Sequence, residues 1–123
     1  MARMNGLQVI IERIMRGAVA TAEIRELLYH RSPLVRAAAV RAIGAAARND
    51  ERLVDELIAA ATAPINGVPL LGTISVAHVA VGCLPQIGTA TALKAAKALV
   101  MKWPEPDRTD LILYLKLKGL EIH

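Results

Sequence analysis

The sequence predicts an all-α fold in a single domain, and its composition and its hydrophobic spacing both point there. Of the 123 residues, 54% are hydrophobic and only 2% are aromatic, with no Phe at all. A β-sandwich core normally uses aromatic and β-branched side chains, whereas Ala and Leu in quantity favour helices. Apolar residues recur at helical spacing in segments joined by short connections, so consecutive helices should be antiparallel neighbours. The high apolar content also excludes an intrinsically disordered chain.

Capping and turn residues divide the first half of the chain into four helices. Asn5 can cap the first helix, and Thr21 begins the second. Ser32 and Pro33 start the third, because serine caps a helix and proline at the first helical position loses no hydrogen bond. Asp50 caps the fourth. The expected spans are 5–16, 21–31, 33–48 and 51–62.

The second half begins with a break over Ala63–Gly72, where two prolines, an Asn-Gly pair and a closing glycine are strong turn signals. Thr73 then caps an uncharged helix that stops before Pro85. Thr89 or Thr91 opens a further helix, which ends at another proline. These two helices span about 73–84 and 92–103.

The C-terminal segment has two readings. Leucines alternate with other residues along 111–118, which is a strand pattern. Asp107 or Thr109 as a cap, lysines near the end and Gly119 as a terminator instead favour a helix, as does the all-helical context. We expect a helix.

The segment from Leu57 to Leu93 is unusual because it contains no Asp, Glu, Lys or Arg. Its most apolar window, Leu70–Leu84, is shorter than the roughly 20 residues that a membrane span needs, so no span is predicted. The uncharged helix is either a core helix covered by the last helices, or a surface that packs against a second copy of the chain or another protein. The candidate interface residues are Ile65, Val68, Leu70, Leu71 and Val79.

The net charge of +4 is mildly basic, and part of it gathers on one face of the predicted helix 33–48 and at the start of the next helix. Arg41, Arg48 and Arg52 could form a strip that binds phosphates or an acidic partner. The alternative is a solvated helix face, because acidic residues follow closely at 51, 55 and 56. No aromatic residues interleave with the arginines, so base stacking has no support.

Reactive side chains are few. A single cysteine, Cys83, excludes an intramolecular disulfide and a zinc site with several cysteines. His78 lies five residues away, about 140° around a helix, so the two should not converge. We find no catalytic constellation, no metal site and no cofactor motif. The N-terminus lacks the pattern of a secretory signal, which favours a reducing, cytoplasmic location.

One stretch resembles a known family. Ser32–Gly44 closely resembles the second helix of a HEAT repeat. The shared pattern is a polar residue, Pro, a hydrophobic residue, Val-Arg, spaced alanines and Ile-Gly. The pair Ile87-Gly88 repeats Ile43-Gly44 after 44 residues, within the HEAT period. The resemblance implies a short α-solenoid with an N-terminal capping helix. Its parts would be the cap at 5–16 and antiparallel helix pairs at 21–48, 50–88 and 89–119.

The resemblance also implies roles. In HEAT-like proteins the Arg after Val commonly bonds to the backbone or to an acidic residue of the next unit, so Arg36 would join adjacent repeats. Its position at the edge of the apolar stripe agrees with this role. Stacked second helices form recognition surfaces in such proteins. The expected function is therefore a non-catalytic scaffold that binds a protein partner or itself. The alternatives are phosphate-backbone binding to nucleic acid and a non-catalytic subunit of a larger enzyme.

Overall fold

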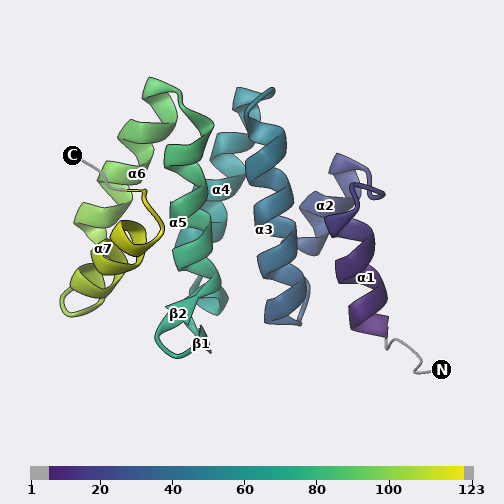
Figure 1. Ribbon diagram of the computed structural model, residues 1–123, viewed down its shortest axis with the longest axis horizontal. Coiled ribbons are helices and arrows are strands. Elements are labelled where there is room, and N and C mark those ends of the chain that lie inside the picture. The colour runs from purple at the N-terminus through teal and green to yellow at the C-terminus, as the bar shows by residue number, and fades with distance from the viewer. Residues whose placement is uncertain (1–5, 121–123) are drawn as a thin grey trace.

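Helices dominate the part of the chain that the computed structural model describes, residues 6–120 (Figure 1). The all-α class is confirmed, with one small hairpin added. The α-helices are α1 (Gly6–Met15), α2 (Thr21–Leu27), α3 (Pro33–Ala47), α4 (Val54–Thr62), α5 (Val76–Ile87), α6 (Ala90–Lys102) and α7 (Asp107–Leu117). The strands are β1 (Pro69–Leu71) and β2 (Ile74–Ser75), and 3-10 turns occupy Glu51–Leu53 and Pro64–Gly67.

Local signals place the start of α3 correctly, and Thr89, one of the two expected caps, begins α6. The fourth helix begins later than expected, at Val54, because Asp50 caps the 3-10 turn before it. The Val35 N–H donates to Ser32 Oγ at 3.5 Å, and the Ala92 N–H donates to Thr89 Oγ1 at 3.1 Å. The C-terminal segment forms α7, so the helical reading is confirmed and the strand alternative is wrong. The proposed cap at Asn5 lies outside the described residues. The second helix is shorter than expected and ends at Leu27.

The uncharged helix begins and ends differently from the prediction. β1 and β2 pair antiparallel, which puts Thr73 in the turn between them rather than at a helix cap. Ser75 caps α5 instead, in a reciprocal capping box with His78. Pro85 lies inside α5, which continues to Ile87 and ends at Gly88 in the left-handed conformation, φ 83°.

The helices form two layers. In Figure 1, α1, α3 and α5 lie side by side, α2 and α4 lie behind them, and α6 and α7 lie at the C-terminal end of the row. α3 contacts α1, α2, α4 and α5, while α5 contacts α3, α4, α6 and α7. α3 and α5 are therefore the central helices. Within residues 6–120, no helix has both the length and the apolarity to cross a membrane.

Central position explains why α3 and α5 are so rich in small residues and why α5 carries no charge. Every residue from Val35 to Val40 and from Val76 to Leu84 is buried. A Cβ on Gly44 would lie 2.8 Å from Cys83 Sγ, closer than real Cβ atoms come, so the approach of α3 to α5 requires glycine there. The part of the uncharged segment that forms α5 is thus core up to Leu84, whereas most of the loop before it is exposed.

Arg36 is a buried charged residue that joins two parts of the chain. Its side chain is 3% exposed. Nε donates to Asn66 Oδ1 at 2.8 Å, and Nη1 donates to the carbonyl oxygens of His30 and Arg31 at 2.7 and 3.0 Å. Nη2 lies 3.5 Å from the Ile65 carbonyl oxygen. The guanidinium group therefore fastens the turn before α3 to the 3-10 turn after α4.

Candidate functional site

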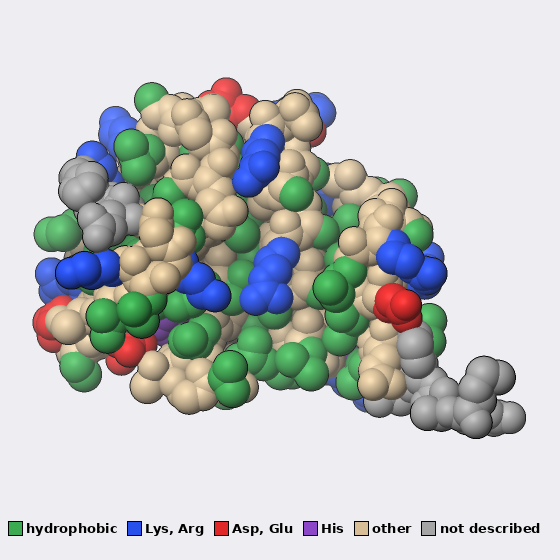
Figure 2. Space-filling model, in the orientation of Figure 1, with side chains coloured by type: hydrophobic (Ala, Val, Ile, Leu, Met, Phe, Trp, Pro, Cys, Tyr) green, Lys and Arg blue, Asp and Glu red, His purple; other side chains and the backbone are tan. Residues whose placement is uncertain are grey.

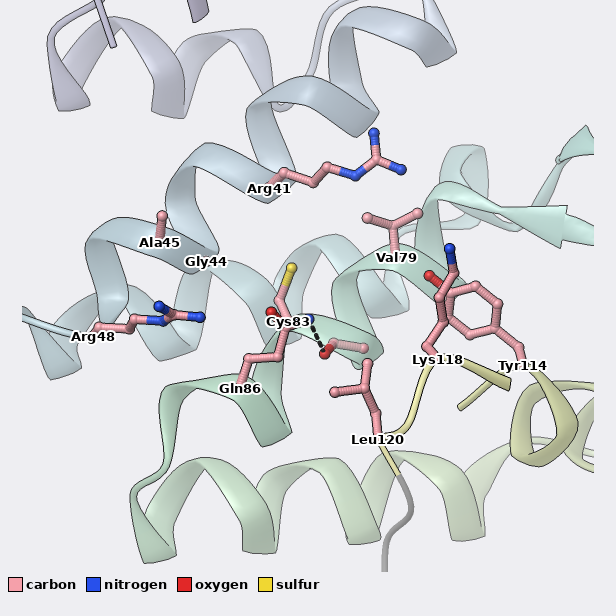
Figure 3. Close-up of a pocket in the computed structure, with 11 residues that line it drawn as sticks. Arg41, Gly44, Ala45, Arg48, Val79, Cys83, Gln86, Tyr114, Lys118 and Leu120 are labelled. Carbon is pink, nitrogen blue, oxygen red and sulfur yellow. Dashed lines mark hydrogen bonds between the residues drawn. The ribbon is translucent and has the colours of Figure 1, made fainter. Parts of the chain in front are cut away.

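A cavity of about 510 Å³ opens where α3, α5 and the end of α7 meet (Figure 3). It lies directly over the close contact between α3 and α5 that Gly44 permits. The cavity wall combines basic, polar and small apolar side chains. Its residues are Arg41, Gly44, Ala45, Arg48, Val79, Gly82, Cys83, Gln86, Tyr114, Lys118 and Leu120.

Three exposed cations surround the cavity. Arg41 and Arg48 are seven residues apart on α3, so they share one helix face about 10 Å apart along the axis. Both side chains extend from α3 toward α5 in Figure 3, and Lys118 approaches from the end of α7. Within residues 6–120, none of these three has a carboxylate within 4 Å, and the cavity lining includes no Asp or Glu. Figure 2 shows basic side chains over α3 with no acidic side chain between them.

The floor of the cavity is neutral. Burial raises the pKa of the Cys83 thiol to about 11, and the nearby Arg41 and Arg48 lower it by a smaller amount. Burial likewise raises the pKa of the Tyr114 hydroxyl. Neither group carries a negative charge at neutral pH, so the cations are not neutralised from below. The Tyr114 hydroxyl has no hydrogen-bond partner in the described part of the chain.

This arrangement is suited to holding an anion. Guanidinium groups bind carboxylate and phosphate oxygens through two parallel hydrogen bonds, and an ammonium group adds a point charge. Among residues 6–120, the cavity lining contains no imidazole and no carboxylate.

The basic strip predicted from sequence is divided. Arg41 and Arg48 lie together, but Arg52 forms two hydrogen bonds to the carboxylate of Asp50, at 3.0 and 3.1 Å, beside a different surface depression. Lys118 takes its place as the third cation of the cavity. Sequence reasoning missed Lys118, because only tertiary packing brings the end of α7 next to α3.

The apolar interface predicted from sequence is also reduced. Ile65, Val68 and Leu71 are exposed on the loop between α4 and α5, with Leu71 75% exposed. Leu70 packs in part against the core. Val79 is a correction, since it is 5% exposed and lies in the wall of the cavity, where α5 is covered by its neighbours. The uncharged helix is therefore not a free surface.

A second polar cluster ties the start of α5 to α7. His78 Nε2 lies 3.0 Å from Asp110 Oδ2, and Thr73 Oγ1 donates to Asp110 Oδ1 at 2.9 Å. His78 Nδ1 accepts the backbone N–H of Ser75 at 3.0 Å, which places the proton of a neutral ring on Nε2, facing Asp110. Sequence reasoning missed this link, because Asp110 is 32 residues away.

Ser, His and Asp are the residue types of a nucleophilic triad, but this cluster is built as a cap. Ser75 is 2% exposed, and its Oγ accepts the His78 N–H at 3.4 Å. The same imidazole nitrogen that would take a serine proton already accepts a backbone N–H. Trp103 and Tyr114 pack edge-on against His78, with ring centroids 5.0 and 5.5 Å away. The cluster fixes α7 in place.

Comparison of the chain with known protein families, with curated proteins and with solved structures finds no match. Between residues 6 and 120, no three His, Cys, Asp or Glu side chains come together in a way that could hold a metal ion. The cavity and its charges are therefore the features of the molecule that indicate a function.

Proposed function

We propose that this chain is a short HEAT-like α-solenoid that acts as a non-catalytic protein-binding module, and that it binds an acidic segment of a partner protein over α3, α5 and α7. One observation carries the proposal. Arg41, Arg48 and Lys118 surround one cavity without a carboxylate partner in the described residues. Unpaired cations around a concave surface attract and orient an anionic segment.

The solenoid part of the proposal is supported by the order of the helices. After α1, the pairs α2/α3, α4/α5 and α6/α7 follow one another along the chain, and α3 packs on α5. Arg36 reaches from the first pair to the turn inside the second. The unpaired thiol of Cys83 fits a reducing, cytoplasmic setting. A non-catalytic subunit of a larger enzyme would use the same binding surface.

A protein partner is favoured over a nucleic-acid backbone. A duplex contacts a track of cations along its phosphates, whereas here the cations surround one cavity and Arg52 is paired with Asp50 elsewhere. Self-association through α5 has no support, because that helix is buried. The exposed side chains of Ile65, Val68 and Leu71 offer a smaller apolar contact for the same partner.

Fluorescence anisotropy with a labelled Glu-rich peptide of about 12 residues tests this proposal. The wild type should bind the peptide, and Arg41→Glu with Arg48→Glu should abolish binding, because the cavity then repels it. The matched control is Lys94→Glu with Lys97→Glu on α6, which changes the net charge equally but leaves the cavity intact. Equal loss in both double variants would mean that only net charge matters, and the proposed site would be wrong.

A labelled DNA duplex of about 20 base pairs serves as the competing probe. Under the proposal it binds more weakly than the peptide and responds equally to both double variants. Tighter duplex binding with a steep decrease in affinity as salt rises, lost only in the α3 double variant, would overturn the proposal in favour of nucleic-acid binding.

A further inference from the structure

The cavity between α3, α5 and α7 has features that select among anions. Ala45 lies between Arg41 and Arg48 on α3, and Gly44 and Gly82 add no side chain, so small residues and the Cys83 thiol line the space between the two arginines. A small group can therefore enter between the two guanidinium groups.

The charges also exceed what a single carboxylate would balance. Arg41, Arg48 and Lys118 carry three formal positive charges, and the floor beneath them is neutral. A carboxylate has one negative charge and two oxygens, whereas a phosphomonoester has close to two charges and three strong acceptor oxygens. The unpartnered hydroxyl of Tyr114 supplies one further donor beside Lys118.

We propose that this cavity receives a phosphomonoester group carried by a side chain of the bound polypeptide. The proposal rests on the proposed function, since it names the group that anchors the partner segment. Arg41 and Arg48 bind phosphate oxygens from α3, and Lys118 binds from α7. Val79 and Leu120 supply the apolar wall against which the carbon part of the modified side chain packs.

The apolar wall accommodates either an alkyl or an aryl phosphate, so phosphoserine and phosphotyrosine are the two sources to separate. Four labelled peptides, identical except at one central position, distinguish them. That position holds phosphoserine, phosphotyrosine, Glu or unmodified Ser, and the rest of each peptide is neutral. Anisotropy is measured with the full chain at constant ionic strength.

At least one phosphopeptide should bind about tenfold or more tightly than the Glu peptide, and phenyl phosphate should compete with it. Arg41→Gln and Lys118→Gln should each weaken phosphopeptide binding by about tenfold, because each removes one of the cations that bind the phosphate. Both side chains are exposed, so the substitutions remove no core contact. Arg52→Gln removes one positive charge outside the cavity and should change binding by less than about twofold. Circular dichroism confirms that each variant is folded.

The outcomes separate the two proposals. If the Glu peptide binds as tightly as both phosphopeptides, and Arg41→Gln weakens all three equally, the phosphate inference is wrong while the acidic-segment function stands. If none of these peptides binds and the Glu-rich peptide also fails, both are wrong. Phosphopeptide binding that is unchanged in Arg41→Gln and Lys118→Gln would also overturn the inference, because the phosphate would then lie elsewhere.

Discussion

Replacing Arg36 with Ala should destabilise the fold strongly, although Arg36 does not line the basic cavity. The substitution removes the donors that hold Asn66 Oδ1 and the carbonyl oxygens of His30 and Arg31. These acceptors come from two different helix connections, so the loss releases both at once. Asn66 is itself 2% exposed, which leaves its oxygen without water as a substitute partner.

The magnitude follows from the number and quality of these bonds. Three of them are 3.0 Å or shorter, and hydrogen bonds to charged groups contribute about 1.5–3 kcal/mol each. Their simple sum is too large, because alanine also removes the cost of burying a guanidinium group. Each buried acceptor that loses its donor costs about 1–3 kcal/mol. We expect about 3–4 kcal/mol, equivalent to a decrease in Tm of roughly 10–20 °C for a domain of this size.

Urea titration and thermal unfolding followed by circular dichroism measure the effect. The matched control is Arg31→Ala, which removes the same charge from an exposed side chain and should cost less than about 0.5 kcal/mol. Arg36→Lys should lie between the two, because lysine keeps the charge but cannot make the forked set of bonds. If Arg36→Ala is no less stable than Arg31→Ala, the view of Arg36 as a structural link is refuted.

Four further predictions concern the contacts around α5. Asp110→Ala should lower the free energy of unfolding by about 1–3 kcal/mol, because the buried His78 ring loses its acceptor. The control is Asp107→Ala in the same first turn of α7, which should cost less than about 1 kcal/mol. Equal urea midpoints for the two variants would contradict this prediction. Gly44→Ala should cost about 1–3 kcal/mol, because its Cβ would lie 2.8 Å from Cys83 Sγ, and wild-type stability would show that α3 and α5 can separate freely. The Cys83 thiol, with its pKa raised from 9.0 to about 11, should react with iodoacetamide at pH 8 about a hundredfold more slowly than in urea. Because burial favours the protonated form, the Cys83 contribution to stability should be complete below about pH 9 and lost as the pH rises through about 11, which unfolding curves at several pH values can check.

The sequence was sufficient to predict the helices whose ends are set by neighbouring residues. Ser32 and Thr89 cap α3 and α6 because their hydroxyl groups reach the N–H three residues ahead, which is a purely local interaction. α5 was predicted less well. Pro85 normally ends a helix, yet here the helix continues, since α5 is held on several sides by other helices and tertiary packing overrides the local preference.

The candidate site was predictable only in part, for the same reason. Arg41 and Arg48 were identified because their spacing on one helix puts them on one face. Lys118 is distant from both arginines in the sequence, and only the packing of the helices brings it to the same cavity. The contact between Asp110 and His78 depends on tertiary packing in the same way. An uncharged segment is compatible with either an interface or a core helix, because burial on both sides of a helix such as α5 produces the same pattern.

The bond between His78 and Asp110 has a consequence for how the cavity behaves over time. α7 supplies Lys118 and Tyr114 to the cavity, and it is fastened to the start of α5 by the two hydrogen bonds of Asp110. The basic cavity is therefore complete only while α7 is docked. A ligand that binds Arg41 and Lys118 together holds α7 against α3 and must, by thermodynamic linkage, shift the opening equilibrium of that helix. Slower amide hydrogen exchange along α7 would then report occupancy of the cavity, at a distance from the atoms that bind the ligand.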